Sequence, residues 1–121
     1  MGLPIIQNNH VRVKPCKHGD FSYNINDTVI GQCLDQYGEY AEAELALAPQ
    51  ILRPGAKVID VGANIGVHSV FYSSVIGNEG EVYAFEPSHL NYFFLMTNLT
   101  LNSAFNVTPI KGAVGTKRPL Y

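Results

Sequence analysis

The hydrophobic positions in the second half of the chain alternate between two periods. Residues 57–61 (Lys-Val-Ile-Asp-Val) and 81–86 are short runs rich in β-branched or aromatic residues. The first run is typical of a strand buried on both faces. The segment between them has apolar residues at helical spacing, at Val67, Val70, Phe71 and Val75. The pattern therefore predicts a strand, a helix and a second strand.

A further helix and a third strand continue this order. Ser88 is a good N-cap for a helix, and we expect the Phe93-Phe94 pair of that helix to lie in the core. Residues 107–111 form the third strand, and Pro109 places it at a sheet edge because proline cannot donate into a ladder. The succession predicts an α/β fold, a doubly wound parallel sheet of about three strands with right-handed crossovers.

The N-terminal part has a different pattern. Residues 11–13, 21–23 and 28–30 are short β-leaning pieces, so we expect two or three short antiparallel strands there. A run of helix formers follows from Gly38 and ends before Pro54. Its apolar stripe consists of Ala41, Leu45, Ala48 and Leu52. We therefore divide the chain into a β-leaning extension, residues 1–36, and an α/β domain, residues 37–121.

Composition narrows the class of protein. A chain of 121 residues with 46% hydrophobic and 15% charged residues is the size of one domain and buries a core. Its formal charge of −2 gives no global positive field, so we expect neither a nucleic-acid partner nor a membrane surface. No apolar run is long enough for a membrane span, and no signal segment stands at the start, which favours a cytoplasmic protein.

The two cysteines do not indicate a bridge or a metal site. Cys16 and Cys33 are expected to be free thiols in a reducing compartment. With His10 and His18 they match no paired-ligand spacing of a zinc site, so no metal is predicted.

The chemistry of the chain is concentrated where the two buried strands end. Asp60 lies at the tip of the first strand, Gly62 and Gly66 bound a tight loop before the helix, and Glu86 ends the second strand. Glycines let the backbone approach a ligand, and the helix N-terminus offers N–H groups to an anionic portion of it. Glu86 would accept hydrogen bonds from ribose hydroxyls. The arrangement predicts a nucleoside site.

Charge indicates which nucleoside. The loop reads G-x-x-x-G, not the dinucleotide pattern G-x-G-x-x-G, and no G-K-[ST] of a P-loop follows. Asp60 would repel a pyrophosphate, since two like charges at ~4 Å cost about 1 kcal/mol even in water. An NAD-dependent enzyme is therefore disfavoured. The same carboxylate suits the ammonium and sulfonium groups of S-adenosylmethionine.

These segments resemble the N-terminal half of an FkbM-type SAM-dependent methyltransferase, over about residues 27–116. The resemblance is carried by 38–40, by Asp-Val-Gly-Ala-Asn-Ile-Gly-Val-His at 60–68, by 82–87 and by Asn-Leu-Thr-Leu-Asn at 98–102. It implies a Rossmann-like fold of the class I methyltransferase type, S-adenosylmethionine as cofactor, and O-methylation of a small-molecule or glycan hydroxyl. It also implies that Asp60 and the loop residues Gly62, Ala63, Asn64 and Gly66 hold the methionine end, that Glu86 holds the ribose, and that Ala113 and Val114 lie near the adenine.

Each strand-end residue also has a structural alternative. Asp60 could instead hold loop N–H groups. Glu86 could be a surface acid at a strand end. Asn64 could be selected for a left-handed turn.

The candidates around the next helix are less specific. His68, in the first helical turn, is a cofactor contact and a weak catalytic candidate, or else a structural histidine. Tyr40 and Glu44, spaced i, i+4, could share a helix face and reach the methionine end or the acceptor, or else form a solvated face. The general base is not assigned.

The sheet is incomplete by comparison with this family, whose domain has about seven strands. The sequence ends after three strands of the sheet, which leaves the 57–61 strand with an open flank. We therefore expect self-association, aggregation, or completion by another polypeptide at that edge. Two hypotheses follow: a truncated methyltransferase, or a non-catalytic nucleotide-binding or interaction module that keeps the half-fold.

Overall fold

The computed structural model describes residues 3–115 and contains the predicted parallel sheet. Its strands are β4 (Lys57–Val61), β5 (Glu81–Glu86) and β6 (Val107–Lys111), hydrogen-bonded in the order β4-β5-β6. Two helices, α3 (Val67–Ile76) and α4 (His89–Leu101), make the crossovers. The α/β prediction is confirmed, and Pro109 lies on β6 at the edge of this three-stranded sheet, as expected.

Only one face of the parallel sheet belongs to the core. Val82 and Ala84 of β5 are fully buried and cluster with side chains of α3 and α4. The opposite face of β4 is open, since Ile59 and Val61 are 67% and 60% exposed. The expectation that β4 is buried on both faces is wrong, because within residues 3–115 the core cluster includes no side chain from that second face.

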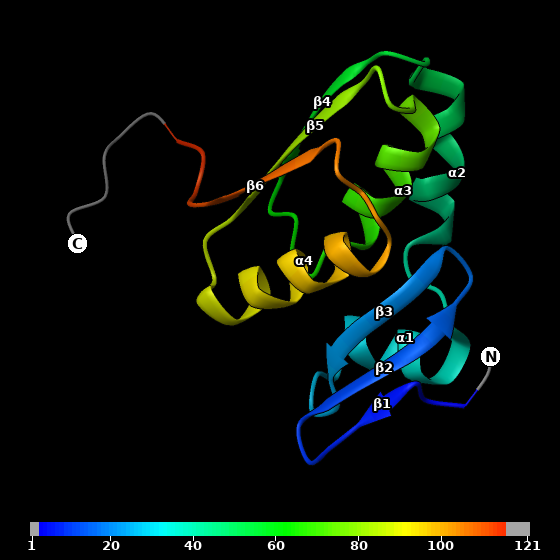
Figure 1. Ribbon diagram of the computed structural model, residues 1–121, viewed down its shortest axis with the longest axis vertical. Coiled ribbons are helices and arrows are strands. Elements are labelled where there is room, and N and C mark those ends of the chain that lie inside the picture. Colours follow the sequence, from blue (N-terminus) through cyan, green and yellow to red (C-terminus); the bar gives the residue numbers. More distant parts are fainter. Residues whose placement is uncertain (1–2, 116–121) are drawn as a thin grey trace.

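The N-terminal part forms a small antiparallel sheet with a helix beside it (Figure 1). Its strands β1 (Ile6–Gln7), β2 (Val11–Cys16) and β3 (Gly19–Asn24) are ordered β1-β2-β3. The strands expected at 11–13 and 21–23 are confirmed. The piece at 28–30 instead leads into helix α1 (Ile30–Tyr37). The reason is Asp27, whose carboxylate accepts the N–H groups of Val29 and Gly31 and so begins a helical turn.

The helix predicted from Gly38 begins later than expected. Helix α2 spans Glu42–Ile51, because Gly38 ends α1 in a left-handed conformation and Ala41 is also left-handed, with φ 57°. Tyr40 therefore lies in the connection and not on the helix.

One core joins the two parts of the chain. Phe21 and Tyr23 of β3 and Leu34 of α1 belong to the same buried cluster as α3, α4 and the parallel strands. Phe94 is buried there as expected, but Phe93 is 52% exposed, so that half of the prediction is wrong. Neighbouring residues of a helix point about 100° apart, and α4 turns only one of the two rings inward.

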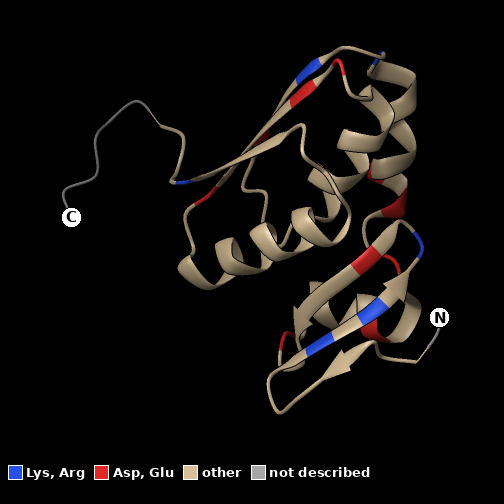
Figure 2. Ribbon diagram, in the orientation of Figure 1, with Lys and Arg blue, Asp and Glu red and all other residues tan. Residues whose placement is uncertain are grey.

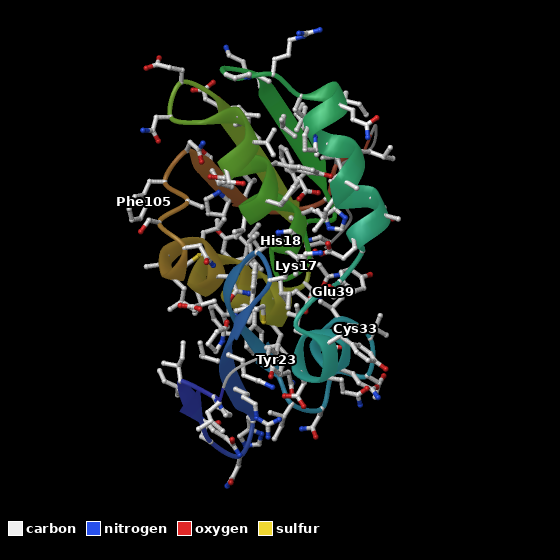
Figure 3. The ribbon with its side chains drawn as sticks, turned by 90° about the vertical axis from the view of Figure 1, so that its right-hand side faces the viewer. Lys17, His18, Tyr23, Cys33, Glu39 and Phe105 are labelled. Carbon is white, nitrogen blue, oxygen red and sulfur yellow. The ribbon has the colours of Figure 1, made fainter. Side chains whose placement is uncertain are left out.

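Two side chains at the tip of the β2–β3 hairpin contact the first residue of α2. Lys17 Nζ and His18 Nε2 each lie 2.8 Å from a carboxylate oxygen of Glu42. Lys17 also lies 3.8 Å from Glu39, and Figure 3 shows both hairpin residues beside the segment that carries Glu39.

Over residues 3–115, no helix has the length and hydropathy required to cross a bilayer. Cys16 and Cys33 are free thiols. The same part of the chain holds no cluster of three potential metal-ligating side chains.

Candidate functional site

The predicted site residues gather at the carboxyl ends of β4 and β5. These strands are parallel and pair Asp60 with Ala84 and Val61 with Phe85, so their ends lie at the same edge of the sheet. The loop 62–66 runs from β4 to α3 across this edge, and its Gly62 and Ala63 N–H groups both donate to Phe85 O at 2.9 Å.

Glu86, the last residue of β5, is hydrogen-bonded to this loop. Its Oε1 accepts the Asn64 N–H at 2.7 Å, and its Oε2 accepts the Ser88 N–H at 2.9 Å. The residue is only 5% exposed, so it is not the surface acid of the alternative interpretation. A carboxylate offers about four lone-pair positions, which leaves acceptor capacity beyond these two bonds.

Asp60 has a different environment. Its Oδ2 accepts a hydrogen bond from the Ser69 hydroxyl, at 2.6 Å, while the loop amides bond to Phe85 and Glu86. Burial raises the pKa of Asp60 above its ordinary value, and the charge of Glu86 adds to this, against the Ser69 hydrogen bond and the nearby His68. A cationic ligand group would offset this cost of burying the carboxylate.

The backbone of the loop leaves room for a ligand. Gly62, Asn64 and Gly66 all have positive φ, at 71°, 58° and 96°. The left-handed conformation at Asn64 matches the structural reason considered for that residue. A Cβ atom on Gly62 would meet nothing within 4 Å, so the backbone is open to close approach there. No side chain caps the N-terminus of α3, which begins after Gly66.

His68 lies at the centre of a small polar and aromatic cluster. Its Nε2 is 2.7 Å from Glu44 Oε2, and its ring meets those of Tyr40 and Tyr72 edge-on at 6.3 and 5.9 Å between centroids. Tyr40 and Glu44 do not share a helix face, yet both reach His68. Glu44, Asp60 and Tyr72 also line a groove of about 400 Å³ between α2 and β4.

Ala113 and Val114 follow β6 at the same edge of the sheet. Ala113 and Val114 are both exposed. The preceding Gly112 donates its N–H to Glu86 O at 3.2 Å. This places them beside the strand end that carries Glu86.

Two site residues have no clear signal in the sequence. Ser69 is fully buried against Asp60, and Asn98 of α4 is fully buried and donates to Ile65 O in the loop at 2.7 Å. Both lie within apolar helices, where an isolated small polar residue does not reveal its partner. For Asn98 the sequence offers the i, i+4 pair of asparagines at 98 and 102, in a segment that carries part of the family resemblance, but not its partners.

Comparison with known proteins gives the fold. Neither a known protein family nor a curated protein sequence matches this chain. Solved structures do match, among them Trm5b from Pyrococcus abyssi, with 19% identity over 89% of this chain and 30% of that one, at a TM-score of 0.66. The tRNA m1G37 methyltransferase of M. jannaschii matches with 17% identity over 88% of this chain and 31% of that chain, at 0.65. Protein-L-isoaspartate O-methyltransferase matches with 23% identity over 62% of this chain and 24% of that chain, at 0.57.

The chain therefore has the Rossmann-like fold of class I methyltransferases. It spans about a quarter to a third of the length of these three structures. The N-terminal sheet takes part in the likeness, because 89% coverage exceeds what residues 37–121 alone can supply.

One expectation needs correction. Net charge predicted that nucleic acid is no partner, yet the fold is shared with a methyltransferase named for tRNA. The prediction is wrong because net charge reports only the long-range field, whereas an acceptor is recognised by local surfaces. Figure 2 shows the basic residues of the described part spread over β2 and the tip of its hairpin, the segment after α2, β4 and β6.

Proposed function

We propose that this chain binds S-adenosylmethionine and supplies the cofactor site of a methyltransferase, of the FkbM type that its motifs resemble. Asp60 faces the ammonium group, Glu86 holds the ribose, and the α3 N-terminus with loop 62–66 receives the ligand carboxylate. Ala113 and Val114 flank the adenine.

The observation that carries the proposal is the pairing of two different carboxylates at adjacent strand ends. Asp60 is partly buried and bonded to one hydroxyl, while Glu86 is fixed by two backbone amides. Gly62 follows Asp60 in the loop that crosses the two strand ends, and the space where its Cβ would lie is open. Two acids suit a ligand with a cationic end and a diol and disfavour a diphosphate.

The residues of this chain would position the cofactor and accept a proton. Bound S-adenosylmethionine supplies a methyl group on a cationic sulfur. Asp60 and Glu86 orient the two ends of the ligand, so that an acceptor oxygen can approach in line. His68, held by Glu44 at 2.7 Å, is the candidate to take the proton that a hydroxyl acceptor releases.

Calorimetry with S-adenosylhomocysteine tests the cofactor site. Asp60→Asn keeps an oxygen that can accept from Ser69 and removes only the charge, so we expect affinity to fall by about 1 to 3 kcal/mol. Glu79→Gln is the matched control, since Glu79 is exposed in the loop after α3, and it should bind like the wild type. Equal affinity in all three proteins contradicts the proposal.

The acceptor we propose is a hydroxyl on a small molecule or glycan, as the family resemblance implies. A second candidate is an RNA, favoured by the likeness to tRNA methyltransferases over 88–89% of this chain. Transfer from labelled S-adenosylmethionine to tRNA, compared with transfer to hydroxyl compounds, separates the two. Binding without transfer to any acceptor favours the non-catalytic module instead. His68→Gln should lower transfer to a hydroxyl more than it lowers cofactor affinity.

A further inference from the structure

Asn98 is a fully buried residue of α4 whose side chain hydrogen-bonds to two other parts of the fold. Its amide makes four hydrogen bonds. Oδ1 accepts from the N–H and the hydroxyl of Ser22, both at 2.7 Å, and Nδ2 donates to Ser22 O at 3.1 Å and to Ile65 O at 2.7 Å. Two acceptor and two donor positions are all that a carboxamide has, so none is left unpaired.

Asn102 repeats part of this arrangement one turn later. Its Oδ1 accepts the Asp20 N–H at 3.0 Å, and its Nδ2 donates to Asp20 O at 2.8 Å. Ser22 and Asp20 are alternate residues of β3, so their N–H and C=O groups point to the same side, away from β2. The two asparagines therefore bind the free edge of β3 as a neighbouring strand would.

The two asparagines differ in one contact. Asn98 also holds the carbonyl of Ile65, whereas Asn102 donates its remaining bond to Asn98 O at 2.8 Å, within the end of α4. Ile65 is 2% exposed and stands between Asn64, which bonds Glu86, and Gly66, which faces Leu95 of the same helix. Asn98 is thus the polar link from β3 to the loop 62–66.

We infer that Asn98 is a positioning residue that holds the loop 62–66 in its ligand-binding conformation and connects it to the edge of the N-terminal sheet. The inference rests on the proposed function, because the loop is the proposed contact for the methionine end. Asn98 acts through the Ile65 carbonyl, which lies two peptide units after the Asn64 N–H that is bonded to Glu86.

The chain supplies its own control for the test. Asn98→Ala removes three hydrogen bonds to Ser22, and Asn102→Ala removes two to Asp20, so both should lower the melting temperature. Only Asn98→Ala frees the Ile65 carbonyl. We expect Asn98→Ala to weaken S-adenosylhomocysteine binding by about tenfold or more, and Asn102→Ala by no more than about twofold. Equal losses in the two variants overturn the inference.

Hydrogen exchange provides a readout that needs no ligand. The Asn64 amide should exchange faster in Asn98→Ala than in Asn102→Ala, relative to the wild type. If the wild type does not bind S-adenosylhomocysteine, the proposed cofactor fails, and this comparison still decides the positioning role.

If Asn98→Ala does not fold, the wild type decides. Saturating S-adenosylhomocysteine should then slow exchange of the Ser22 amide, bonded to Asn98, more than that of the Asp20 amide, bonded to Asn102. Equal effects on the two amides overturn the inference.

Discussion

Replacing Gly66 by alanine should destabilise the fold through two separable effects. Gly66 has φ 96°, and an added Cβ would lie 2.9 Å from Leu95 Cδ1, a fully buried side chain. The left-handed backbone costs a side chain about 1–2 kcal/mol. Overpacking against Leu95 adds about 1–3 kcal/mol. The lower entropy of the unfolded alanine chain returns about 0.4–1 kcal/mol. We expect a net loss of about 2–4 kcal/mol.

Gly62→Ala is the matched variant, because Gly62 also has positive φ, at 71°, but a Cβ there meets nothing within 4 Å. Only the backbone cost remains, so its loss should be about 1 kcal/mol. Urea unfolding followed by circular dichroism gives both values if the slopes agree. Equal losses in the two variants would refute the argument that contact with Leu95, and not the backbone conformation alone, requires glycine at position 66.

Three further predictions concern charge and burial. Burial raises the pKa of Asp60 in the folded protein, so the protonated carboxyl favours folding at low pH and this stabilisation is lost as pH rises through the raised pKa. Near neutral pH the buried charge opposes folding, and Asp60→Asn should therefore raise the melting temperature of the ligand-free protein. A lower melting temperature contradicts this. Hydrogen bonds from Tyr23 and Arg12 lower the pKa of Asp35, so stability should fall as pH drops through that value, and Asp35→Asn should flatten urea midpoints measured from about pH 7 to about pH 3. Phe94→Ala should cost about 3–5 kcal/mol, whereas Phe93→Ala, at a half-exposed ring, should cost far less in the same unfolding assay.

The parallel sheet could be predicted because its signals are local. The β-branched run at 57–61 and the breaker residues on either side of it fix β4, and Pro109 indicates the edge position of β6. Helix α1 was missed because its start depends on the Asp27 carboxylate, which competes with the β-leaning residues that follow. Burial of β4 was overestimated for a different reason. Apolar composition cannot tell whether a second layer covers the strand.

The candidate site was predictable in position but not in its internal bonding. Asp60, the loop glycines and Glu86 follow from their places at strand ends, and the fold brings them to one edge. Ser69 and Asn98 depend on contacts between distant elements, which no periodicity reveals. The convergence of Tyr40 and Glu44 on His68 has the same origin, because Tyr40 lies in the α1–α2 connection and Glu44 lies in the first turn of α2, so the two do not share a helix face.

The hydrogen bonds from Glu86 to the loop decide how its proposed ligand contact should be tested. Glu86 is both a proposed ligand contact and the acceptor for the Asn64 and Ser88 amides, so its replacement changes the loop as well as the ribose contact. In Glu86→Gln one carboxylate oxygen becomes an amide donor that faces a backbone N–H. We therefore expect a lower melting temperature, faster exchange of the Asn64 amide and weaker S-adenosylhomocysteine binding together. Weaker binding with unchanged exchange would mean that Glu86 acts on the ligand alone and does not hold the loop.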